Sequence, residues 1–254
     1  PGSQHDLLDA LLGTGTPVVV IAVTGRPYAL GRYAGRAAAL VQAFMPGVEG
    51  AGAIAGVLSG RIVPSGRLPV QIPTLTGAQP STYLQAPLGH ATAGISSLDP
   101  TPAYPFGHGL SYTSFAYDGL RVSADELPTD GSVDATITVT NTGARAGAEV
   151  VQLYHSGPRS AVVRPERALL GFARVMLDPG EAADVTFTVA ADRLAVTDRT
   201  GKRAVDPGTV SLLFAASAAD VRAGIDLPVT GSRRIVGPDR ALTTPAAVAY
   251  ARAD

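Results

Sequence analysis

Two stretches in the C-terminal half of the chain alternate strictly between apolar and polar residues, and this pattern constrains the fold most. In Asp134–Thr140 and in Asp184–Val189, every second residue is Ala, Ile, Val or Phe, and the others are mostly threonine. Successive side chains of a strand point to opposite faces, so each stretch predicts a strand buried on one face only. Further strands are expected at 149–155, 169–177 and 209–215, separated by the turn sequences Asn141–Gly143, Asp178–Gly180 and Asp206–Gly208. Short strands at this spacing predict a β-sandwich of immunoglobulin or fibronectin type III style over residues 113–230.

The N-terminal half follows a different pattern. Residues 17–23 are continuously apolar and rich in β-branched side chains, which is typical of a strand buried on both faces of a parallel sheet. Leucines at helical spacing precede this strand, and the next elements expected along the chain are a helix at 32–40, a strand at 39–44, a helix at 49–58 and a third strand at 68–72. The predicted fold class is therefore α/β followed by all-β: a parallel-sheet α/β segment over 1–112, which includes an irregular, proline-rich loop at 73–105, then the sandwich, and a tail at 231–254 without a clear element.

Charge is distributed unevenly along the chain. The whole chain has 20 basic and 21 acidic residues, yet only nine of these 41 lie in residues 1–112. Two interpretations stay open: protein outside this sequence covers that surface, or the surface is simply rich in Ala and Gly. A net charge of −1 without a basic stripe argues against nucleic-acid and membrane partners.

The absence of cysteine excludes disulfides, thiolate metal sites and a cysteine nucleophile. Cytoplasmic location is favoured over secretion, although the composition leaves the compartment open. The chain begins with Pro1, and we expect this numbering to start within a longer protein.

Several long motifs, in a consistent order, resemble family 3 glycoside hydrolases of the β-glucosidase/β-xylosidase type. They are the strand and turn at 17–27, the Pro-Gly-Val-Glu-Gly string at 46–50, Pro-Ser-Gly-Arg-Leu-Pro at 64–69 and Tyr-Pro-Phe-Gly-His-Gly-Leu-Ser-Tyr-Thr at 104–113. The likeness continues through Val150–Tyr154 and Leu170–Phe172 into the sandwich. His108 stands where the family commonly has tyrosine.

The resemblance implies a retaining, exo-acting β-glycosidase, with β-glucosidase first and β-xylosidase next. Such hydrolysis needs two carboxylates about 5–5.5 Å apart. In the family, the nucleophile belongs to an N-terminal barrel and the acid/base glutamate lies upstream of the segment matched by Pro1–Gln4, so no catalytic residue maps onto this chain. The implied partners are the N-terminal barrel of the same protein and a β-linked oligosaccharide or aryl glycoside. No cofactor is expected, and the segment alone is expected to be inactive.

The remaining polar candidates favour structural roles. Glu49 follows a Pro-Gly break and is expected to start a helix, and Ser65 is expected in a turn. His90 lies in the irregular loop and is the one candidate for reaching a substrate cleft, whereas the four histidines show no metal-ligand spacing. The other acidic candidates are expected at strand edges or in loops: Asp118, Asp125, Glu126, Glu149, Glu166 and Glu181.

Two other classes of function stay open. The chain could be a non-catalytic carbohydrate-binding or scaffolding module, or an adhesin-type sandwich. The absence of tryptophan disfavours a free-standing sugar-binding module, because such modules usually stack sugars on exposed aromatic rings. Homo-oligomerisation stays open as well.

Overall fold

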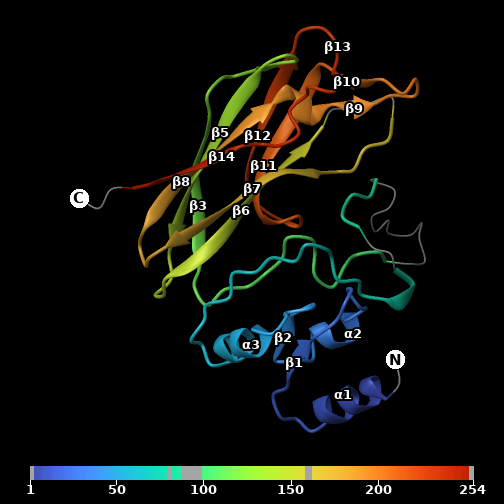
Figure 1. Cartoon of the computed structure of the whole chain (residues 1–254), viewed down its shortest axis with the longest axis vertical. Helices are drawn as coiled ribbons and strands as arrows, with labels where there is room; N and C mark the ends of the chain where they lie inside the picture. Colours follow the sequence, from blue (N-terminus) through green and yellow to red (C-terminus); the bar gives the residue numbers. More distant parts are fainter. Residues whose placement is uncertain (1–2, 79–81, 87–98, 158–161, 252–254) are drawn as a thin grey trace. The chain divides into compact units, whose positions relative to one another are not determined.

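The computed structural model describes residues 3–78, 82–86, 99–157 and 162–251. The chain divides into two compact units, and it passes between them several times (Figure 1). Unit 1 comprises residues 1–62, 70–82 and 90–105, and unit 2 comprises residues 63–69, 83–89 and 106–254. The motif at 64–69 and most of the motif at 104–113 therefore belong to the second unit.

Unit 1 contains the parallel strand pair predicted from the apolar runs. Strand β1 (Val19–Ala22) pairs in parallel with β2 (Ala39–Gln42), with Val19 opposite Ala39. The helices are α1 (Gln4–Leu12), α2 (Gly31–Ala34) and α3 (Gly50–Leu58), followed by a short 3₁₀ turn η1 (Thr76–Ala78). Parallel strands need a crossover connection, and α2 lies in the connection between β1 and β2.

Three local predictions for unit 1 were wrong. The helix expected at 32–40 ends at Ala34, because the chain enters β2 at Ala39. The strand expected at 68–72 forms only an isolated bridge, between Ile72 and Tyr104. Strand β1 is not buried on both faces, since Val19 and Ile21 are 46% and 38% exposed in this chain.

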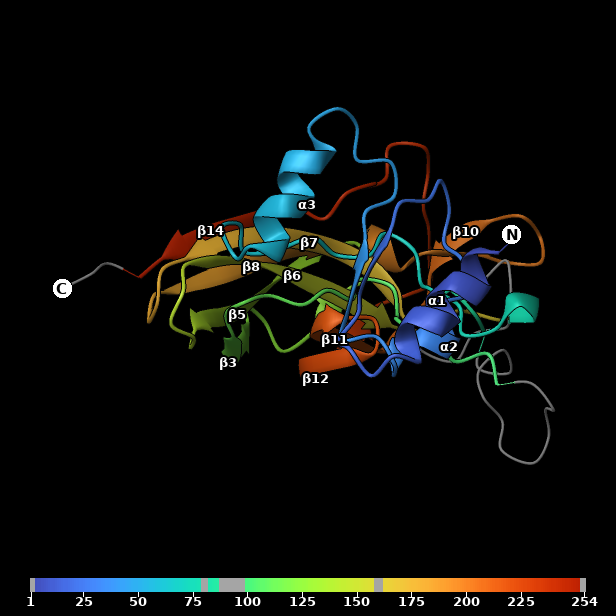
Figure 2. The same ribbon diagram turned by 90° about the horizontal axis from the view of Figure 1, so that it is seen from below.

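Unit 2 is a β-sandwich, as the alternating stretches predicted (Figure 1, Figure 2). Among the described residues, one sheet has the order β4-β12-β11-β6-β7 and the other the order β14-β8-β5-β3. The strands are β3 (Phe115–Val122), β4 (Leu127–Pro128), β5 (Ser132–Asn141), β6 (Gly147–Ser156), β7 (Ala168–Leu177), β8 (Ala182–Ala190), β11 (Gly208–Ser217), β12 (Asp220–Thr230) and β14 (Ala246–Tyr250).

The core of the sandwich consists of the apolar residues of the alternating strands. Ile137 on β5 and Phe187 on β8 are fully buried, and Phe187 packs against Phe214 of β11 with ring centroids 5.9 Å apart. The threonines that alternate with the apolar residues of β5 and β8 lie on the other face of the sheet. There the hydroxyls of Thr136 and Thr186 hydrogen-bond to each other across the two strands at 2.8 Å. Burial on one face of each sheet therefore sets the register.

The C-terminal segment contains elements that the sequence did not indicate. A small sheet joins β9 (Val196–Thr197), β10 (Arg203–Val205) and β13 (Arg234–Ile235), and the 3₁₀ turn η3 (Ala191–Leu194) precedes it. Strand β14 then pairs antiparallel with β8, so the expectation of no element beyond residue 230 was wrong. Strand β14 adds an edge strand to the sandwich, which covers hydrogen-bonding groups that β8 would otherwise expose.

Candidate functional site

The two most distinctive motifs of the chain meet at Leu68. The Leu68 N–H donates to the carbonyl of His108 at 2.9 Å, and the Gly107 N–H donates to the carbonyl of Leu68 at 2.8 Å. In unit 1, the Ile72 N–H donates to the carbonyl of Tyr104 at 2.8 Å. The Ile72–Tyr104 bridge is antiparallel, so it holds together the two ends of the excursion between residues 73 and 103.

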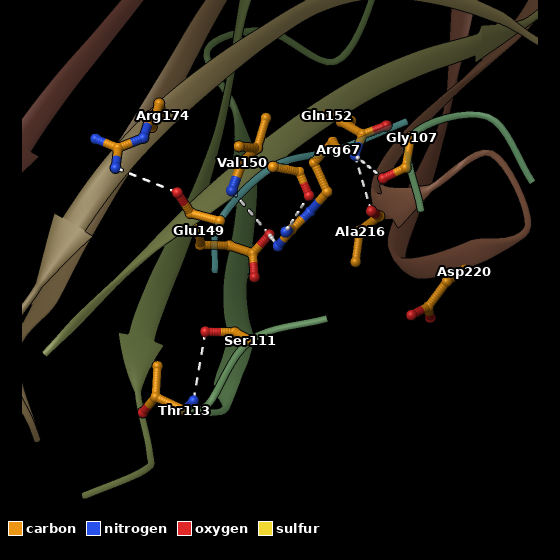
Figure 3. A network of polar contacts seen from close by, with 12 residues as sticks. Arg67, Gly107, Ser111, Thr113, Glu149, Val150, Gln152, Arg174, Ala216 and Asp220 are labelled. Atoms are coloured by element: carbon orange, nitrogen blue, oxygen red, sulfur yellow. Dashed lines mark hydrogen bonds and ion pairs between the residues drawn. The ribbon is translucent and has the colours of Figure 1, made fainter. Parts of the chain in front are cut away.

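A buried ion pair joins the first motif to strand β6 (Figure 3). The Arg67 Nη2 donates to Oε1 of Glu149 at 2.7 Å, and the side chains are only 9% and 6% exposed. The same carboxylate oxygen accepts the N–H of Val150 at 2.8 Å. Removing two charges from water is costly, so this pair depends on its short contact and its additional hydrogen bond.

The prediction that Glu149 is a strand-edge or loop charge was wrong. Glu149 is the one Asp or Glu among the described residues that is buried. Its partner Arg67 lies 82 residues away in the sequence, so no local pattern indicates the contact. The Glu149 carboxylate is thus engaged by the Arg67 guanidinium and by the Val150 N–H.

A second buried polar side chain holds the other motif. The Gln152 amide nitrogen donates to the carbonyls of Gly107 at 3.1 Å and Ala216 at 2.8 Å, and its oxygen accepts the Tyr154 hydroxyl at 2.6 Å. Figure 3 shows both hydrogen bonds that run from the Gln152 amide nitrogen to Gly107 and Ala216. The residue at 107 must be glycine, because its φ is +78° and an added Cβ would lie 2.0 Å from the Gln152 oxygen.

Aromatic rings fix the described residues 82–86 to the sandwich unit. Tyr83 stacks on Phe106 with ring centroids 4.2 Å apart and contacts Tyr154 edge-on at 6.1 Å. The Tyr83 hydroxyl accepts the N–H of Leu169 at 3.2 Å, and burial raises the pKa of this tyrosine. Phe106 is thus occupied by packing against another ring.

The three described histidines lie in different local environments. His108 is half-buried, and burial together with the Arg67 charge lowers its pKa, against an opposing effect of Asp220. His5 bonds through Nδ1 to the Tyr33 hydroxyl at 2.6 Å in unit 1. His155 lies in β6, and His90 lies outside the described residues. The proposal that His90 reaches a substrate stays a prediction.

Other polar candidates hold the structure at its surface. Glu49 is exposed at the N-terminal cap of α3 and makes no side-chain capping bond. The Ser65 hydroxyl accepts from Arg174 at 3.3 Å, and the Glu181 carboxylate accepts the N–H of Asp178 at 2.8 Å within a turn. The Ser65 and Glu181 contacts brace turns, whereas Glu49 starts α3 without a side-chain bond to the helix.

The described residues contain no group of three His, Cys, Asp or Glu side chains that could hold a metal ion. None of the helices in the described ranges is long and apolar enough to cross a bilayer. The polar network around Arg67 and Gln152, which we call the clasp, fixes the motifs at 64–69 and 106–112 on β6 and β11 through the contacts described above.

Two regions of the chain match models of known protein families. Residues 1–112 match the glycosyl hydrolase family 3 C-terminal domain, and residues 149–218 match the fibronectin type III-like domain.

Curated relatives carry both regions in longer chains. The chain is 36% identical to a periplasmic beta-glucosidase of Salmonella typhimurium over 88% of its length, and 34% identical to a beta-xylosidase of Formosa agariphila over 85%. It spans only about 30% of the length of each of these relatives.

Solved structures show the same fold. A β-glucosidase from Erythrobacter marinus superimposes with a TM-score of 0.83 and 35% identity, covering 91% of this chain and 30% of that chain. A β-glucosidase from Listeria innocua, solved in complex with glucose, gives the same TM-score at 29% identity, covering 91% of this chain and 33% of that chain. The chain therefore belongs to glycoside hydrolase family 3, of which it carries the C-terminal domain followed by a fibronectin type III-like domain.

Proposed function

We propose that this chain is the C-terminal part of a retaining, exo-acting β-glycosidase that removes terminal β-linked glucose, with xylose as the next candidate. The observation that carries the proposal is the order and extent of the likeness: relatives named beta-glucosidase and beta-xylosidase align over 85–88% of the chain. The chain covers the smaller share of those enzymes, and we propose that the remaining part of the protein supplies most of the active site.

We further propose that the catalytic carboxylates come from protein outside this sequence. The buried carboxylate, Glu149, is bound to Arg67, and Asp9 is bound to both Arg32 and Arg36 at 2.6 and 2.8 Å. Both carboxylates are thus engaged in ion pairs within the chain. Retaining hydrolysis needs two facing carboxylates, one of which is able to donate a proton.

The surface of unit 1 supports a missing partner, which we propose is the N-terminal barrel of the same protein. Leu7, Val23, Met45 and Val48 are between 61% and 98% exposed, and β1 presents Val19 as well. A parallel sheet is normally covered on both faces, and large exposed apolar patches usually mark interaction surfaces. The irregular loop at 73–105 is proposed to form a wall of the substrate cleft.

The proposal is tested by assaying the complete protein on a panel of aryl β-glucosides, β-xylosides and α-arabinosides. We expect turnover with retention of the anomeric configuration, which nuclear magnetic resonance of the first-formed sugar reveals. Inversion, or no turnover on any member of the panel, would count against the proposal and favour the scaffolding alternative.

A further inference from the structure

The described residues 82–86 lie within the irregular loop at 73–105, yet from Tyr83 onward they belong to the sandwich unit. Exposure alternates along them: Leu84 is 46% exposed, while its neighbours Tyr83 and Gln85 are partly buried. Alternate side chains of an extended segment point to opposite faces. Tyr83 and Gln85 therefore share the less exposed face of this segment.

The Tyr83 ring packs against two other rings of the sandwich unit. It stacks on Phe106, with an angle of 15° between the ring planes, and it meets Tyr154 edge-on at 85°. Tyr154 is fully buried on β6 and packs in a small cluster with Ala215 and Ala218. The Ala218 N–H also donates to the carbonyl of Phe106 at 2.9 Å. Tyr83 thus packs on rings whose own positions are fixed by the sandwich.

Two backbone hydrogen bonds add to this attachment. The N–H of Leu169, at the start of β7, donates to the Tyr83 hydroxyl at 3.2 Å. The N–H of Glu166 donates to the carbonyl of Gln85 at 3.3 Å. Aromatic pairs stabilise a contact beyond the area that they bury. The segment is therefore fixed to the sandwich by one ring and two hydrogen bonds, and Tyr83 takes part in all but one of these contacts.

We propose that Tyr83 is a positioning residue of the enzyme, through which the sandwich unit holds the irregular loop at 73–105 in the conformation that binds substrate. This inference rests on the proposed function, in which that loop forms a wall of the substrate cleft. The catalytic carboxylates are proposed to lie outside the chain, so Tyr83 should contribute to binding and not to bond breaking. Losing an interaction that is made equally before and in the transition state raises KM and leaves kcat unchanged.

The test measures KM and kcat of the complete protein on a chromogenic aryl β-glucoside, for the parent and for Tyr83→Ala and Tyr83→Leu. Both variants remove the ring, and Tyr83→Leu keeps most of the apolar bulk. A loop that is docked for part of the time binds with a proportionally lower apparent affinity. We expect KM to rise at least about threefold, with kcat within about twofold of the parent value. A residue that only stabilises the fold would lower the melting temperature and leave KM unchanged.

Two controls isolate the ring of Tyr83. Tyr83→Phe keeps the ring and loses only the hydroxyl, so it should restore KM to within about twofold of the parent value. Tyr250→Ala is the matched control, because Tyr250 lies on β14 and is 49% exposed. Hydrogen exchange followed by mass spectrometry reports the docking itself: the amides of Leu169 and Glu166 should exchange faster in Tyr83→Ala than in the parent protein.

The outcomes separate this inference from the proposed function. A complete parent protein without turnover would overturn both. An active parent whose Tyr83→Ala and Tyr83→Leu variants keep the parent KM, or lose kcat alone, would overturn the positioning role and leave the proposed function standing. The positioning role is also overturned if Tyr83→Phe behaves as Tyr83→Ala does, or if both ring-removing variants fail to unfold cooperatively, since Tyr83 would then be a residue of the fold.

Discussion

Replacing Glu149 by alanine should destabilise the sandwich strongly, because it leaves Arg67 charged and almost fully buried. The side chains are 6% and 9% exposed, and their contact is 2.7 Å long. At an effective dielectric constant of about 20, unit charges about 4 Å apart attract by about 4 kcal/mol. Removing one partner of a buried pair typically costs about 3–5 kcal/mol. We therefore expect Glu149→Ala to lower the free energy of unfolding by about 3–5 kcal/mol.

A mutant cycle tests whether the loss comes from the stranded charge. The double replacement of Arg67 by Met and Glu149 by Leu removes both charges and fills similar volume, so its stability should lie within about 1–2 kcal/mol of the parent chain. The matched control is Asp220→Ala, which breaks the exposed Arg222–Asp220 pair, whose side chains are 42% and 48% exposed. An exposed pair contributes about 1 kcal/mol at most.

Urea unfolding followed by far-ultraviolet circular dichroism is the appropriate assay, since the chain contains no tryptophan. The reasoning is refuted if Glu149→Ala costs no more than Asp220→Ala. It is refuted equally if the double variant loses as much stability as Arg67→Met and Glu149→Leu lose separately, added together.

Three further predictions concern stability. Gly107→Ala should lower the free energy of unfolding by about 3 kcal/mol in the urea assay, because a left-handed backbone and a close contact to the Gln152 oxygen act together. The control Gly180→Ala, at a similar φ of +80° but in open space, should lower it by about 1–2 kcal/mol. Burial lowers the pKa of His155 to about 4 in the folded chain, so below about pH 6.5 the unfolded chain binds a proton that the folded chain does not. The free energy of unfolding should therefore fall by about 3 kcal/mol between about pH 6.5 and pH 4, and His155→Phe should remove this dependence. Phe187→Ala, at a fully buried position, should cost about 3–5 kcal/mol by calorimetry, and a loss below 1 kcal/mol would contradict the assigned core.

Local patterns predicted the sandwich because its strands obey a period of two. Val133, Ala135, Ile137 and Val139 are all at most 1% exposed in the structure, so the alternation in β5 identified the inward face directly. The parallel pairing of β1 with β2 was predictable for a similar reason, since apolar runs flank a connection long enough for a crossover. Strand β14 was missed because its sequence, Ala-Ala-Val-Ala-Tyr, has little periodicity and depends on the exposed edge of β8.

The contacts of the clasp were beyond local prediction. The motifs around Arg67 and Gly107 were evident from their residues, yet Glu149 was expected at a strand edge. An ion pair between residues 82 positions apart follows from tertiary structure alone. The same holds for Gln152, whose partners Gly107 and Ala216 lie 45 and 64 residues away. The family resemblance identified the motifs at 64–69 and 104–113, whereas their contacts with β6 and β11 depend on the folded sandwich.

The most direct test of the account compares the 254-residue chain with the complete protein on a chromogenic aryl β-glucoside. The account predicts turnover by the complete protein and none by the chain alone, even when circular dichroism shows that its sandwich is folded and unfolds cooperatively. Hydrolysis by the purified chain at a rate comparable to that of the complete protein would show that it carries its own catalytic carboxylates, and would contradict the account.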